Sequence, residues 1–157
     1  MILLALLLVA CSPAPVQRLY RAPDAPIYSS AVVEPVRLSG GWVQVAGFAP
    51  DGQAVCGPGS VNIEGGIIRW DLCLSQGPAD GAGPFAPGKP GRFAVGGMSD
   101  WWVLWVDGDY RTVVIGTPSG DFGFVLNREA DIPADRMQAV RDILRFNGYE
   151  TAELAVF

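Results

Sequence analysis

Residues 101–128 read WWVLWVDGDYRTVVIGTPSGDFGFVLNR, and this stretch decides the fold. Three runs rich in Trp, Val, Ile and Phe are separated by short turn signals, a pattern typical of β-strands. Asp107-Gly108-Asp109 predicts a two- or three-residue hairpin turn, because Gly and Asp accept the positive φ of tight hairpins. Residues 117–120, Thr-Pro-Ser-Gly, predict a second turn. The stretch therefore predicts an antiparallel meander of three strands.

Both faces of this meander are expected to be apolar. Strict alternation puts Trp101, Val103 and Trp105 on one face with Tyr110, Thr112 and Val114, and leaves on the other Trp102, Leu104, Val106, Val113 and Ile115. A sheet with one face in water alternates apolar and polar residues instead. Two arrangements cover both faces: a sandwich with a helix outside, or a closed barrel with an apolar interior and a helix on its exterior.

Composition narrows the function. The 157 residues suffice for one domain with a real core, and the mean hydropathy of +0.27 is high. The net charge of −5, without a basic cluster, argues against a nucleic-acid partner. The absence of histidine removes the usual general base and the commonest metal ligand. The sequence therefore predicts no enzyme, no metal and no cofactor.

The N-terminus predicts a membrane anchor. Residues 1–10 are apolar but too short for a helix that crosses a bilayer, which needs about 20 residues. The sequence Leu8-Val9-Ala10-Cys11 resembles a bacterial lipoprotein signal. That resemblance implies a signal peptide over 1–10, acylation of Cys11 (palmitate among the acyl chains) and, since Ser12 is not Asp, the outer membrane, facing the periplasm. A truncated signal or a stray apolar end is the alternative. Residues 11–37, rich in proline, predict a tether that becomes an ordered cover.

Residues 40–48, GGWVQVAGF, predict the first strand. Together with the meander they carry a family pattern, formed by Gly40-Gly41-Trp42, by Asp107, Tyr110 and Gly116, and by an aromatic strand that ends at Arg128. From about residue 38 to its end, the chain resembles bacterial outer-membrane lipocalins of the apolipoprotein-D-like branch. The resemblance implies an all-β, eight-stranded antiparallel up-and-down barrel over 38–157, with one C-terminal helix packed outside. It also implies that Arg128 stacks on Trp42, both as markers of the fold rather than catalytic residues.

Residues 53–75 predict a hairpin. A two-residue turn at Glu64-Gly65 sorts most of its apolar residues to one face, and it places Cys56 opposite Cys73. Cross-strand Cα atoms lie within disulfide range. With Cys11 acylated, the remaining two cysteines pair, so the sequence predicts a Cys56–Cys73 bond; two reduced cysteines in a cytosolic hairpin are the alternative.

The remaining elements are expected as follows. Residues 77–91 contain few strand formers, so Phe85 and 93–95 are taken as remnants of the fourth and fifth strands. Residues 132–147 predict the helix, since Asp131 and Pro133 suit its start and Gly148 its end. Residues 154–157 fit a short final strand.

The aromatic residues point to a binding cup. A barrel of eight strands has room for one small ligand, and the best candidates to line it are Trp70, Trp101, Trp102 and Trp105, with the inward face left open. The resemblance implies fatty acids, lysophospholipids or similar hydrophobic molecules as ligands. Arg69 or Arg111 could meet a head group, although no pattern singles out either. The alternative is a structural or interaction lipoprotein of the envelope, with a filled barrel and no ligand.

Overall fold

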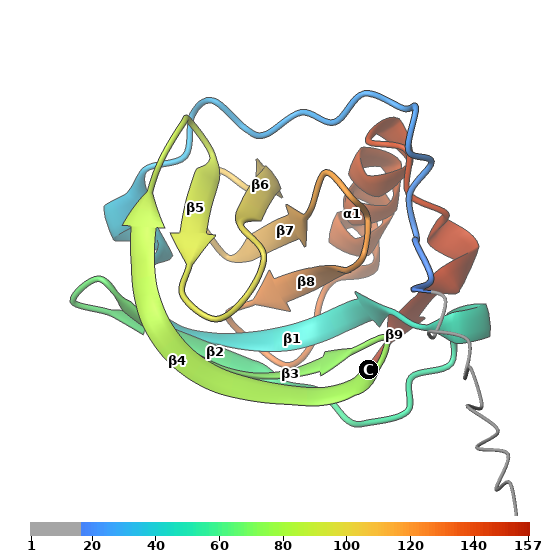
Figure 1. Cartoon of the computed structure of the whole chain (residues 1–157), viewed down its shortest axis with the longest axis horizontal. Coiled ribbons are helices and arrows are strands. Elements are labelled where there is room, and N and C mark those ends of the chain that lie inside the picture. The colour runs from blue at the N-terminus through green and yellow to red at the C-terminus, as the bar shows by residue number, and fades with distance from the viewer. Residues whose placement is uncertain (1–16) are drawn as a thin grey trace, which may run out of the picture.

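The computed structural model describes residues 17–157, and eight of its strands close into one antiparallel barrel (Figure 1). Each strand pairs with the next, and β1 closes the barrel by pairing with both β2 and β8. The strands are β1 (Gly40–Phe48), β2 (Ser60–Glu64), β3 (Ile67–Leu74), β4 (Gly77–Pro87), β5 (Arg92–Val95), β6 (Trp101–Val106), β7 (Thr112–Gly116) and β8 (Gly123–Asn127). The predicted eight-stranded up-and-down barrel is confirmed.

Short helices and one more strand complete the fold. The helix α1 (Ala134–Phe146) follows the barrel, and β9 (Leu154–Val156) pairs with the end of β1. Three 3-10 turns are η1 (Pro35–Leu38), η2 (Pro50–Gly52) and η3 (Thr151–Glu153). Among residues 17–157, no helix is both long and apolar enough to cross a membrane.

The meander is present with one irregularity that the alternation did not predict. In the β6–β7 ladder, Val103 pairs with Ile115 but Trp105 pairs with Val114, so Leu104 is an extra residue in a β-bulge. Leu104 and Trp105 consequently both point out of the barrel. The predicted face assignment is therefore wrong after the bulge, and the inward side chains of the meander are Trp101, Val103, Val113, Ile115, Phe122, Phe124 and Leu126.

The first turn of the meander is longer than predicted. Asp107 and Thr112 are joined by a backbone hydrogen bond of 3.2 Å, which leaves a four-residue loop between them. The Asp107 carboxylate accepts the backbone N–H groups of Arg111 and Thr112 at 2.7 and 2.6 Å, and Tyr110 adopts φ +55°. The side-chain bonds of Asp107 replace the tight two-residue turn that its Asp-Gly pair suggested.

The β2–β3 hairpin has the predicted faces but a shifted register. Its turn is Gly65-Gly66, both at positive φ, so Val61 pairs with Trp70 rather than with Ile68. The slide by two positions preserves which residues point inward. Glycine, unlike Glu64, enters the left-handed region at no steric cost, and the turn lies there for that reason.

The predicted disulfide is confirmed in a different setting. Cys56 and Cys73 are bonded, with their Cα atoms 5.6 Å apart, but Cys56 lies in the loop before β2 and not in the ladder. Here β2 no longer pairs with β1, and the buried Gln44 side chain fills the gap. Its amide donates to the Cys73 carbonyl at 2.7 Å and accepts from the Cys73 N–H at 2.8 Å. The disulfide and Gln44 together attach this end of β3 to its neighbours.

The longest strand, β4, arises from the stretch expected to be poorest in strand formers (Figure 1). It pairs with β3 from Gly77 to Pro84, and Trp70 covers Gly81: a Cβ there would lie 2.5 Å from the Trp70 ring. Gly81 therefore leaves the space that the indole fills, and the expected remnant at Phe85 is the end of a continuous strand.

The outer face of the barrel is covered by α1 and by the N-terminal segment, residues 17–38 (Figure 1). Val140 and Leu144 of α1 are fully buried against the sheet, as the expected outside helix requires. In the N-terminal segment, the buried ring of Tyr20 packs 5.4 Å from Phe48. The Arg21 side chain donates to the Asn147 carbonyl at 2.8 Å. This segment is the ordered cover that the proline-rich sequence predicted.

Candidate functional site

One end of the barrel is closed by the predicted arginine–tryptophan pair. The Arg128 guanidinium lies 3.5 Å from the centre of the Trp42 ring, and burial lowers its pKa. It donates to the carbonyl groups of Gly41 and Ser39, each at 2.9 Å, while the Trp42 N–H donates to Leu38 at 2.8 Å. These bonds hold η1 across the end of the barrel as a plug, so the expected contact of the two fold markers is present.

Tyr110, another residue of the family pattern, holds the same plug. Its hydroxyl accepts the Glu34 N–H at 2.7 Å, and the guanidinium of Arg37 lies 3.9 Å from its ring centre. The positive φ of Tyr110 turns its ring back under η1. This end of the barrel offers no entry for a ligand.

The middle of the barrel is filled by aromatic rings. Phe85 stacks on Phe93 at 4.6 Å between centroids, and Trp101 meets Phe124 edge-on at 5.1 Å. Between Phe85, Trp101 and the closed end at Trp42 lies a void of only about 10 Å³, close to the smallest space that can hold one water molecule. The barrel is therefore packed as a core along this part.

The structure separates the four candidate tryptophans into two pairs. Trp70 and Trp101 belong to the interior cluster, whereas Trp102 and Trp105 pack on the outside of the sheet. The Trp102 ring is covered by Arg92, whose guanidinium lies 3.6 Å from the ring centre. Trp102 and Trp105 therefore cannot line the interior, because the β6 bulge and their strand positions turn them outward.

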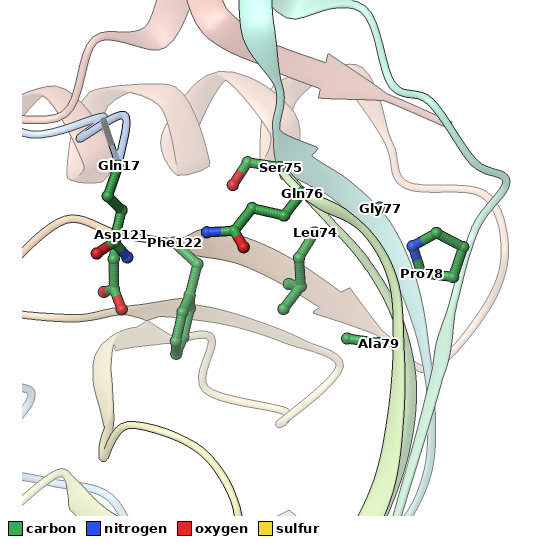
Figure 2. Close-up of a pocket in the computed structure, with 9 residues that line it drawn as sticks. All are labelled: Gln17, Leu74, Ser75, Gln76, Gly77, Pro78, Ala79, Asp121 and Phe122. Carbon is green, nitrogen blue, oxygen red and sulfur yellow. The ribbon is translucent and has the colours of Figure 1, made fainter. Parts of the chain in front are cut away.

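The opposite end of the barrel has an open cavity of about 330 Å³, which we call the mouth (Figure 2). It is lined by Leu74–Ala79 at the β3–β4 turn, by Asp121 and Phe122 before β8, and by Gln17. Leu74 and Phe122 pack against the interior cluster and form an apolar floor. Figure 2 shows these two side chains pointing into the gap between the two turns, with Gln17 and Asp121 on one side.

The electrostatics of the mouth depend on one carboxylate. Among residues 17–157, Asp121 is the only charged residue that lines the cavity. It accepts hydrogen bonds from the hydroxyls of Thr117 and of Ser119, the latter at 2.6 Å, and forms no ion pair within residues 17–157. These hydroxyls fix the carboxylate at the rim without neutralising it.

The two arginines considered for a head group lie elsewhere. Arg69 points outward from the middle of β3 and is exposed. Arg111 lies at the closed end and forms an ion pair with Glu129. Neither lines the mouth. Within residues 17–157, no group of three His, Cys, Asp or Glu side chains is placed to hold a metal ion.

The sequence reasoning missed the mouth residues, although a signal for them existed. In an up-and-down barrel, successive turns alternate between the two ends. The turn after β3 and the turn after β7 must therefore lie at the same end, and these two turns bring Leu74–Ala79 and 121–122 together. The contribution of Gln17 depends on the path of the N-terminal segment, which no sequence pattern specified.

Comparison with known proteins agrees with this architecture. The family model described as "Lipocalin-like domain" matches residues 91–157. A structure of the siderocalin Ex-FABP, a protein said to function through dual ligand specificities, covers 77% of this chain and 93% of its own, with 15% identity and a TM-score of 0.58. The fold is that of a lipocalin. Lobster apocrustacyanin A1 also has it, with 16% identity, coverage of 84% of this chain and 88% of its own, and a TM-score of 0.52. No curated protein matches the sequence.

The lipocalin fold narrows the range of functions. It suggests the binding of small hydrophobic ligands, and proteins with this fold are generally carriers rather than enzymes. In this chain the mouth is an open cavity that reaches the interior cluster, whereas the void near the closed end is too small for such a ligand. Cys11 and the signal-like residues 1–10 lie outside the described residues.

Proposed function

We propose that this chain is a lipid-anchored lipocalin that binds small hydrophobic molecules at its mouth, at the bacterial cell envelope. The observation that carries the proposal is a cavity of about 330 Å³ whose apolar floor, Leu74 and Phe122, continues the core. That volume is at the lower end of the range of about 300–1,000 Å³ typical of ligand pockets. The ligand class is a single-chain lipid, such as a fatty acid or a lysophospholipid.

The anchor is proposed from the sequence, and the position of Gln17 supports it. Gln17 lies at the rim of the mouth, and Cys11 is only six positions before it in the sequence. An extended chain of six residues spans at most about 21 Å. Acyl chains on Cys11 would therefore keep the mouth close to the membrane surface from which single-chain lipids come. The outer membrane, facing the periplasm, and the apolipoprotein-D-like branch remain proposals of the same kind.

The binding mechanism is the reversible burial of an acyl chain. Each methylene removed from water contributes about 0.8 kcal/mol, whereas association costs at least about 4 kcal/mol in lost freedom of motion. About five buried methylenes therefore offset that cost, and longer tails bind with a net gain until the mouth is full.

The test is a titration of the full chain carrying Cys11→Ala, which cannot be acylated, after removal of bound lipid. Tryptophan fluorescence is followed while a long-chain fatty acid or a lysophosphatidylcholine is added. Trp70 and Trp101 lie in the cluster beneath the mouth, so we expect a saturable change in emission. A folded, lipid-free sample that responds to neither lipid would contradict the proposal.

A second function is favoured by one observation. The void near the closed end of the barrel measures only about 10 Å³, as expected for an envelope lipoprotein whose barrel is purely structural. Its N-terminal segment or short loops would then bind a protein partner. The same titration separates the two functions, because the structural protein would not respond to lipid.

A further inference from the structure

We propose that the mouth selects single-chain amphiphiles with a cationic head group over those with an anionic one. This inference rests on the proposed function and specifies its ligand. The juxtaposition that carries it is the Asp121 carboxylate at the rim, directly beside the apolar floor formed by Leu74 and Phe122.

The first step is the placement of the carboxylate. Asp121 and Phe122 both line the mouth (Figure 2), so a tail buried against the Phe122 ring would leave its head group at the rim, where Asp121 lies. The carboxylate is held by the hydroxyls of Thr117 and Ser119 and is half-buried. It is thus fixed where a head group must sit.

The second step is the lack of a competing cation. Within residues 17–157, no Lys or Arg lines the mouth or pairs with Asp121. Arg18, close in sequence to Gln17, forms ion pairs with Glu153 and Asp51 instead. Residues 1–16 contain no Lys or Arg at all. Arg21 lies behind the same turn, but it is buried and its guanidinium donates to the carbonyl groups of Asn147 and Pro118. An anionic head group in the mouth would therefore meet the Asp121 carboxylate with no cation among the described residues that line the cavity, whereas an ammonium group would supply the counter-charge.

The third step is the electrostatic effect of the net charge of the whole protein. The net charge of −5 attracts cations to the protein and repels anions, and both effects weaken as salt is added. A partly exposed ion pair changes an equilibrium constant by between about 1.5-fold and 5-fold. Attraction of the cation and repulsion of the anion together predict that, at low salt, the cationic amphiphile binds about 3-fold to 20-fold more tightly than the anionic one.

The experiment compares three ligands with the same ten-carbon tail. Decyltrimethylammonium, decanol and decanoate are titrated below their micelle concentrations into the Cys11→Ala full chain, and the heat of binding is measured at neutral pH. The expected affinity falls in that order. Asp121→Asn should bring the three affinities to within about 2-fold of one another.

The matched control is Asp80→Asn. Asp80 follows Ala79, a residue that lines the mouth, but its own side chain is exposed on the outside of β4. This variant loses the same charge and should keep the order of affinities.

Each outcome has one meaning. If the Cys11→Ala protein binds decanoate as tightly as decyltrimethylammonium, or more tightly, the inference is overturned while the proposed function stays intact. An order that survives Asp121→Asn, or that Asp80→Asn also abolishes, would overturn the assignment to Asp121. Binding of none of the three ligands would overturn the proposed function and this inference with it.

Discussion

The depth of the mouth can be measured with ligands of graded length. The floor is Phe122, which is 7% exposed and stacks 5.9 Å from Phe124 above the filled part of the barrel. Each additional methylene should tighten binding by about 0.8 kcal/mol, or about 4-fold, until the tail reaches that floor. Beyond that length the extra methylenes stay in water, and the affinity should stop rising.

Phe122→Ala should move this plateau to longer tails. The substitution removes six ring carbons and makes room for about four more methylenes, so the longest ligands should bind more tightly by about 3 kcal/mol, or about 200-fold. The short ligands should change little. The variant should also lose about 3–5 kcal/mol of stability, as buried Phe→Ala changes do, so its folding is checked first by thermal unfolding.

The assay is calorimetry with uncharged monoacylglycerols whose tails run from about six to about fourteen carbons, a range of about 6 kcal/mol if every methylene is buried. Phe146→Ala is the matched control, because Phe146 lies on α1, is 68% exposed and lines no part of the mouth. Two results would refute the reasoning. One is an affinity that rises steadily to the longest tail while Phe122 is present, because the core would then have to open. The other is a plateau that Phe122→Ala leaves at the same tail length.

Three further predictions concern the scaffold. Arg128→Ala should lower the free energy of unfolding by about 2–4 kcal/mol in urea denaturation, because it loses both the contact with Trp42 and several hydrogen bonds; a cost under about 0.5 kcal/mol would contradict this. Replacing Cys56 and Cys73 together by Ala should cost about 3 kcal/mol in the same measurement, and two free thiols in the unreduced, unfolded Cys11→Ala chain would disprove the bond. Burial raises the pKa of Tyr149 to about 12. The unfolded chain releases this proton above pH 10 while the folded protein keeps it, so stability should be full below pH 10 and fall by up to about 3 kcal/mol by pH 12; Tyr149→Phe should lack that fall.

The strands that were predicted correctly are those whose local sequence and tertiary surroundings agree. Residues 40–48 and the three runs of the meander combine β-branched and aromatic residues with clear turn signals, and they form strands where expected. The Arg128–Trp42 contact and the Cys56–Cys73 bond followed from the resemblance and from face parity, respectively. The disulfide prediction was correct although the register was not, because Cys56 reaches Cys73 from the loop before β2 and not from the ladder position in which the pairing was predicted.

The features that were missed depend on contacts between distant segments. The β6 bulge reversed the parity of Trp105, because a single extra residue leaves no mark on the pattern of apolar residues. Strand β4 forms from a stretch rich in Gly and Pro. The glycine at position 81 leaves the space that the Trp70 ring of the neighbouring strand fills. Predicting the mouth requires knowing which turns share an end of the barrel, which the up-and-down topology gives, and where Gln17 lies, which depends on the path of the N-terminal segment.

The most direct test of a ligand seated at the mouth above a filled barrel is chemical-shift mapping by NMR. The ¹⁵N-labelled Cys11→Ala chain is titrated with an uncharged monoacylglycerol. The account predicts saturable shifts confined to 74–79, 121–122 and Gln17, with Trp42 and Arg128 at the closed end unchanged. Saturable shifts that spread to Trp42 and Arg128, or no shifts at the mouth, would contradict it.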